Sequence, residues 1–114
     1  MKTNRHRHHY NFLDYHSGLY YAQVKRYLKT FAADQIHLII FEEFVKEPLQ
    51  HVQQIFRFLG VDPAFVPRIE VNNPSAGHYP ALDPALRQRL AKGYARDITK
   101  LEKLIGKNVG GLWI

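Results

Sequence analysis

The apolar positions of this chain follow a helical period in three stretches and run almost without interruption in one. Apolar residues spaced three or four apart predict amphipathic helices that begin near residues 17, 48 and 84. The uninterrupted run lies at 36–41, where five of the six residues are apolar. Such a strand is typical of a parallel sheet that is buried on both faces. We therefore predict an α/β fold, mostly helical in these 114 residues, with one parallel-type strand and three helices.

The ends of the predicted helices carry suitable capping residues. Ser17 offers a hydroxyl to the first turn of the first helix. Pro48 suits the first position of the second helix, and Gly60 follows its last apolar residue. Asp83 is placed to cap the third helix, which Gly106 would end. Between the second and third helices, a proline-rich stretch predicts a loop.

The predicted strand lacks a partner within the chain. Its backbone N–H and C=O groups need a ladder, and parallel pairing requires further strands joined by crossover connections. No second apolar run of this quality occurs. We therefore expect the other strands to come from a missing N-terminal part of the same domain or from a second chain. Residues 1–14, basic and rich in histidine, are expected to be a poorly ordered lead-in to a domain segment at 15–114.

The amino-acid composition excludes several kinds of functional site. The net charge is +6 with neutral histidines, and three of the sixteen basic residues lie within the first nine positions. The absence of cysteine excludes disulfides, thiolate nucleophiles and thiolate metal sites. The sequence shows neither the apolar region of a signal peptide nor a stretch long enough to cross a bilayer. We therefore expect a cytoplasmic location and no membrane partner.

Two segments could carry ligand chemistry. Glu42 and Glu43 directly follow the strand, at the sheet edge where open α/β sheets bind ligands, although capping or charge pairing is the simpler interpretation. The loop at 72–80 supplies hydrogen-bond donors, a glycine that permits close backbone approach and an aromatic ring that could stack on a base. An ordinary turn-rich connector is the alternative for this loop.

Other polar groups suit a solvated surface. His6, His8 and His9 have neither a carboxylate nor a fixed ligand spacing, so we expect no metal site there. Asp97 and Glu102 interrupt the basic face of the third helix, and we therefore interpret this face as solvated and do not expect nucleic acid as a partner. Its basic residues are Arg87, Arg89, Lys92, Arg96, Lys100 and Lys103. No Ser-His-Asp arrangement, GxGxxG motif or Walker loop is evident.

Three segments, taken in order, resemble a known family. Residues 17–31 are similar to the G-x-Y-x-x-x-L helix that begins the C-terminal part of sulfotransferases that use phosphoadenosine phosphosulfate (PAPS). Residues 34–61 resemble the family's strand, acidic turn, Glu-Pro helix start and Phe-Leu-Gly ending. Residues 79–113 look like its Y-P-x-x-D-P stretch, closing helix and terminal tryptophan. The similarity is greatest to the carbohydrate, or heparan-sulfate, type.

The resemblance implies both a fold and a reaction. It implies the C-terminal portion of a P-loop-like α/β fold, which would supply the missing strands. It also implies transfer of a sulfuryl group from PAPS to a hydroxyl or amine of a carbohydrate or small-molecule acceptor. The family's sulfate-binding loop, 3′-phosphate-binding arginine and serine, and catalytic base would all lie upstream. The isolated chain, on this interpretation, has no catalytic residue and is inactive.

One cofactor element of the family matches this chain in part. The family's loop before Y-P-x-x-D-P carries a serine, a lysine, a glycine and an arginine that wrap the nucleotide. Ser75 and Gly77 match it, whereas Ala76 replaces the lysine and His78 the arginine. The resemblance thus implies Ser75, Gly77, His78 and Tyr79 as cofactor-binding residues, with backbone N–H groups and a protonated His78 in place of the missing cations.

Two other functions fit the same residues. A small basic helical module could bind nucleic acid or an acidic protein partner through the third helix. An interaction domain could instead complete its sheet by dimerisation. Salt-dependent nucleic-acid binding would favour the first alternative, and a tight, well-folded dimer would favour the second.

Overall fold

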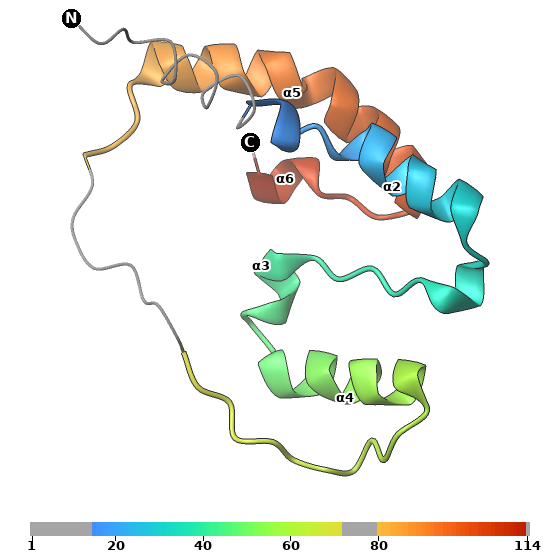
Figure 1. The fold of residues 1–114 in the computed structure, drawn as a ribbon. Helices are drawn as coiled ribbons and strands as arrows, with labels where there is room; N and C mark the ends of the chain where they lie inside the picture. Colours follow the sequence, from blue (N-terminus) through green and yellow to red (C-terminus); the bar gives the residue numbers. More distant parts are fainter. Residues whose placement is uncertain (1–14, 72–79, 114) are drawn as a thin grey trace, which may run out of the picture. The chain divides into compact units, whose positions relative to one another are not determined.

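The computed structural model describes residues 15–71 and 80–113, and these are mostly helical (Figure 1). The chain divides into two compact units, Met1–Ala32 with Ala81–Ile114, and Ala33–Pro80. The first unit contains α2 (Tyr20–Thr30), α5 (Pro84–Ile105) and α6 (Gly110–Trp113). The second contains the 3₁₀ turn η1 (Ala33–Gln35), α3 (Phe41–Phe44) and α4 (Pro48–Leu59). The predicted cofactor loop and the N-terminal lead-in lie outside the described residues.

The predicted strand at 36–41 is not seen. Within the described ranges there is no strand: residues 36–40 belong to no regular secondary-structure element, and Phe41 already belongs to α3. Ile40 keeps extended backbone angles, φ −90° and ψ 121°. The physical reason is that a strand requires a partner: an extended segment becomes a strand only when a neighbouring segment forms backbone hydrogen bonds with it. The described residues supply no such neighbour.

The second and third predicted helices form, with their predicted ends. Pro48 occupies the first position of α4, and Gly60 follows with the left-handed φ of 72°. Asp83 caps α5, since its Oδ1 accepts the backbone N–H of Leu86 at 2.9 Å. Gly106 ends α5 at φ 69°. These local signals succeed because capping depends on residues adjacent in sequence.

The predicted cap of the first helix is wrong. Ser17 lies in a short helical turn at 15–17, and α2 begins only at Tyr20 after Gly18 and Leu19. Leu19, the N-cap residue, has no side chain that can accept a hydrogen bond from the first turn. Asp97 of α5 supplies this acceptor instead, so a residue remote in sequence replaces the local cap.

Helices α2, α5 and α6 pack together in the first unit (Figure 1). Its buried apolar side chains are Ile98 and Leu101 of α5 and Val109, which precedes α6. The Tyr15 ring stacks on the Tyr94 ring, with centroids 4.8 Å apart, and the Tyr94 hydroxyl donates to the backbone oxygen of Tyr15 at 2.9 Å. Burial, followed by the nearby tyrosines, raises the pKa of Tyr94. These contacts hold the residues that precede α2 against the middle of α5.

In the second unit the segment 36–44 returns alongside α4. The His37 ring stacks on that of Phe58 at 5.2 Å, and the Phe44 ring lies 6.0 Å from that of His51. Both histidines thus lie against phenylalanine rings. Several apolar side chains of this unit stay exposed: Leu59 at the end of α4 is 62% exposed, and Phe41 of the adjoining α3 is 70% exposed. The unit therefore presents apolar surface that the described residues do not bury.

Gly18 permits the close approach of the residues before α2 to α5. A Cβ at this position would lie 2.8 Å from the Tyr94 hydroxyl oxygen and 3.0 Å from two ring carbons. We predict that Gly18→Ala displaces the Tyr94 ring and lowers the free energy of unfolding by about 1–3 kcal/mol, the usual cost of overpacking. Chemical denaturation followed by circular dichroism measures the change.

Gly111→Ala is the matched control, because the nearest atom to its added Cβ would be Asn108 Oδ1 at 3.9 Å, an ordinary contact. It should leave the stability close to that of the unsubstituted chain. Equal destabilisation by both substitutions would contradict the proposed role of Gly18.

Candidate functional site

The residues predicted to bind the cofactor, Ser75, Gly77, His78 and Tyr79, lie outside the described residues. The segment before them carries Arg68, whose Nε lies 2.8 Å from Glu70 Oε1. Because this ion pair is largely exposed, it contributes little to stability, but it partly neutralises Arg68, the basic residue that is closest to the loop in sequence. Positive charge for an anion at this loop would therefore have to come from His78 or from elsewhere.

The acidic pair Glu42–Glu43 occupies the first turn of α3. Both side chains are half-buried, and the backbone N–H of Glu43 donates to the oxygen of Ile40 at 3.1 Å. Carboxylates in a first turn interact favourably with the backbone N–H groups exposed there. Their position after an extended apolar segment agrees with the sequence prediction, although the turn is helical. The structure thus places this pair in the first turn of α3, where the N-cap residue Ile40 offers no side-chain hydrogen bond.

Among the described residues, no cluster of three or more potential metal ligands occurs. The described helices also include none that is long and apolar enough to traverse a bilayer. His6, His8 and His9 lie outside the described residues.

Asp97 interrupts the basic face of α5 for a structural reason that the sequence did not reveal. Its Oδ2 accepts the backbone N–H of Tyr21 at 3.2 Å, across 76 positions of sequence. Tyr21 is the second residue of α2, so the carboxylate lies at the positive end of that helix. No local signal identifies such a cap, because its two partners meet only through tertiary packing.

Glu102 has a second structural role on α5. Its Oε1 accepts the backbone N–H groups of Val109 at 2.9 Å and Gly110 at 2.8 Å, at the start of α6. The bonds from Gly110 and Val109 lower the pKa of Glu102, and desolvation opposes them only in part. The available sequence signal was an acidic residue eight positions before a glycine pair. That signal is too common to be diagnostic.

A shallow hollow lies where α5 meets the start of α2. It has a volume of about 340 Å³. The ring of Tyr21 lies nearby in α2, and two ammonium groups approach it: Lys25 Nζ at 5.3 Å and Lys100 Nζ at 5.5 Å from its centroid. The hollow is lined by Leu19, Gly93, Arg96, Asp97 and Lys100. Two of its five lining residues, Arg96 and Lys100, are basic, and one, Asp97, is acidic.

Comparison with known proteins gives two findings. The sequence model of the family described as Sulfotransferase domain matches residues 4–74. A solved structure, the sulfotransferase from Alicyclobacillus acidocaldarius, is similar with a TM-score of 0.69 and 39% sequence identity. The similarity covers 82% of this chain and 34% of that one, so the chain spans about a third of the length of the bacterial protein.

We predict that α6 loosens as the pH falls. The pKa of Glu102 is lower in the native state than its ordinary value of 4.5, so the native state binds this proton less readily than the unfolded state does. The stabilisation is complete above about pH 4.5 and is lost as the pH falls through the lowered native pKa. The fluorescence of Trp113, which follows Gly110 in α6 and packs 5.7 Å from the Tyr20 ring, reports the change.

Glu102→Gln removes the titrating charge and should abolish this acid transition in the Trp113 signal. Glu70→Gln is the control, because Glu70 pairs with Arg68 and belongs to the second unit, whereas α6 belongs to the first. An unchanged acid transition in Glu102→Gln would show that another group controls the attachment of α6.

Proposed function

The chain belongs to the sulfotransferase domain family, and we propose that it forms the C-terminal part of a PAPS-dependent enzyme. The enzyme would transfer a sulfuryl group to a hydroxyl or amine of a carbohydrate or small-molecule acceptor. The observation that carries this proposal is the 39% identity to a bacterial sulfotransferase over 82% of the chain, together with a TM-score of 0.69. Likeness in both sequence and structure supports a common chemistry more strongly than fold alone.

The proposed reaction forms one bond to sulfur and breaks another. The acceptor oxygen or nitrogen attacks the sulfur atom, the bond from sulfur to the phosphate oxygen breaks, and a base takes the acceptor's proton. Charge on the sulfuryl oxygens and on the departing phosphate requires fixed hydrogen-bond donors and cations. The carboxylates of Glu42 and Glu43 have the wrong charge for this task. From the resemblance to the family, we propose that the sulfate-binding loop, the 3′-phosphate-binding residues and the catalytic base lie outside these 114 residues.

The loop at 72–79 is the proposed contribution of this chain to the donor site. Its donor set is a serine hydroxyl, the backbone N–H of a glycine and an imidazole, which suits hydrogen bonding to a nucleotide phosphate. Gly77 would let the backbone approach the phosphate closely, and Tyr79 offers a ring for the adenine. Arg68 is already paired with Glu70, so His78 is the cation most available to this loop.

The remainder of the proposed domain would complete the sheet. Four of the five residues at 36–40 are apolar, yet the segment has no ladder within the described ranges, and Leu38 and Ile39 are 41% and 39% exposed. A neighbouring strand would satisfy the backbone of this segment and would bury these side chains together with the exposed apolar residues of α4. We propose that this strand comes from the N-terminal part of the same domain or from a second chain.

We expect no sulfate transfer from the 114-residue chain alone. Fusion to the part of the bacterial sulfotransferase that this chain does not cover should restore transfer, because it supplies the sheet and the sulfate-handling groups. Transfer of labelled sulfate from PAPS to a panel of sugars and phenols measures the activity. The intact bacterial enzyme is the positive control. Transfer by the chain alone, or no transfer by a folded fusion on acceptors that the intact enzyme uses, would contradict the proposal.

The loop assignment has a separate test in the same fusion. His78→Ala should weaken PAPS binding by about tenfold or more, since hydrogen bonds to charged groups contribute about 1.5–3 kcal/mol. His78→Arg restores the family's usual cation and should bind PAPS at least as tightly as the unsubstituted fusion. Gln50→Ala, an exposed substitution on α4, is the control. Equal PAPS affinity in all of these proteins, measured by calorimetry, would exclude His78 from the donor site.

A further inference from the structure

Five basic side chains form one continuous stripe along α5. They follow one another at intervals of three, four, four and three residues, which places them on the same face of a helix. All five are exposed. With a rise of 1.5 Å per residue, the stripe is about 21 Å long. Its members are Arg89, Lys92, Arg96, Lys100 and Lys103, and we call this set the α5 stripe.

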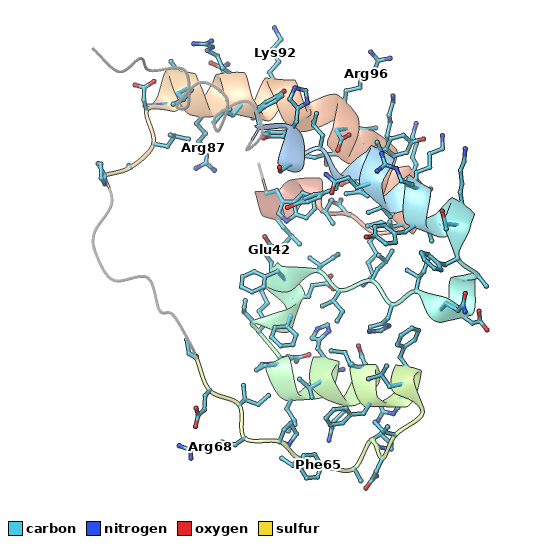
Figure 2. The ribbon with its side chains drawn as sticks, in the orientation of Figure 1. Glu42, Phe65, Arg68, Arg87, Lys92 and Arg96 are labelled. Carbon is cyan, nitrogen blue, oxygen red and sulfur yellow. The ribbon has the colours of Figure 1, made fainter. Side chains whose placement is uncertain are left out.

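The structure sharpens the basic face predicted from sequence. Figure 2 shows Lys92 and Arg96 projecting from the outer side of α5, whereas Arg87 projects from the opposite side. Arg87 therefore does not belong to the stripe. The remaining cations are collinear along the helix, which concentrates their positive potential on one surface.

The acidic residues of α5 leave this charge without direct pairing. Asp97 directs its Oδ2 to the backbone of Tyr21, and Glu102 directs its Oε1 to Val109 and Gly110. None of the five cations of the α5 stripe forms an ion pair with any described residue. The two carboxylates that interrupt the basic face in the sequence thus accept hydrogen bonds from backbone groups.

Helix α2 extends the basic surface to one side. The ammonium groups of Lys25 and Lys100 both lie within 5.5 Å of the centroid of the Tyr21 ring. The hollow of about 340 Å³, lined in part by Arg96 and Lys100, opens beside them. The α5 stripe therefore borders a concave surface to which Arg96 and Lys100 contribute, beside Asp97, whose Oδ2 accepts the backbone N–H of Tyr21. An elongated anionic ligand could contact both the stripe and these two cations.

We propose that the α5 stripe binds an anionic polysaccharide, either the acceptor chain of the transfer or its sulfated product. This inference rests on the proposed function. Each sulfuryl transfer adds negative charge to the acceptor, so a row of unpaired cations would hold a polymeric product more tightly as the reaction proceeds. A sugar polymer needs no stacking of flat bases, and the stripe provides none: Tyr94, the aromatic residue of α5, is already stacked on Tyr15.

Single-stranded nucleic acid is the competing ligand. Proteins that bind it generally combine a basic groove with aromatic side chains on which the bases stack. The Tyr21 ring is approached by two ammonium groups, and Tyr94 is covered by Tyr15. Both rings are therefore already engaged, which favours the polysaccharide.

The test measures binding of the 114-residue chain to heparin and to alginate, with neutral dextran as the uncharged reference. The stripe variant is Arg89→Glu/Lys92→Glu/Arg96→Glu. The control variant Lys46→Glu/Arg57→Glu/Arg87→Glu has the same net charge but leaves the stripe intact. At physiological salt the stripe variant should bind both anionic polymers about tenfold more weakly or worse, and its log–log salt slope should fall by about two to three. The control variant should retain its affinity within about twofold, and dextran should not bind.

Four results would overturn the inference. Equal losses of affinity in both variants would show an effect of net charge alone. Failure of the chain to bind either heparin or alginate would exclude an anionic polysaccharide as the ligand. Binding of dextran with the affinity of alginate would show that charge does not determine the binding. Tighter stripe-dependent binding of an oligothymidine of matched charge would favour nucleic acid. Circular dichroism checks helix content, and Arg89→Gln/Lys92→Gln/Arg96→Gln replaces any charge-reversal variant that unfolds. Because these measurements need no PAPS, their outcome is separate from that of the transfer assay.

Discussion

Two carboxylates of α5 hold the rest of their unit by accepting backbone N–H groups. Asp97 fixes the start of α2, and Glu102 fixes the start of α6. Each bond satisfies a donor that its own helix cannot satisfy, because the first N–H groups of a helix have no partner within it. The buried side chains Ile98, Leu101 and Val109 lie between and beside these two anchors. The long helix thus serves as the scaffold on which the two shorter ones are placed.

The same anchors determine the outer surface of α5. Since both acids turn toward backbone groups, the exposed cations of the α5 stripe keep their charge available. The residues that position α2 and α6 and the cations of the α5 stripe therefore lie on the same helix, α5. Substitution of either carboxylate would change the packing of the unit as well as the potential over the stripe.

Burial imposes a different constraint on the second unit. Leu38 of the segment 36–40, Phe41 of α3 and Leu59 of α4 are exposed, whereas in an independent domain such side chains would be buried in the core. The chain spans about a third of the bacterial sulfotransferase, and membership of the family gives a reason for this exposure, since a larger sheet would cover it. The apolar segment and the family assignment thus support the same proposal from independent observations.

The sequence alone determined the helices and their ends wherever the signals are local. Pro48, Gly60, Asp83 and Gly106 act through neighbours a few residues away, so their roles follow from residue type and spacing. The family assignment also came from the order and spacing of short segments, and the comparisons confirm it as far as the sulfotransferase domain. The cofactor loop stays a prediction.

Only the tertiary structure decided the remaining points. The cap of α2 by Asp97 joins residues 76 positions apart, and no local pattern could have distinguished it from the expected Ser17 cap. The prediction of a strand at 36–41 was wrong because strand formation also depends on remote residues. Residue type can favour an apolar, extended segment, but a strand exists only where a neighbouring segment pairs with it. Helix ends are local properties of the chain. Strand pairing and remote caps depend on which segments are brought together.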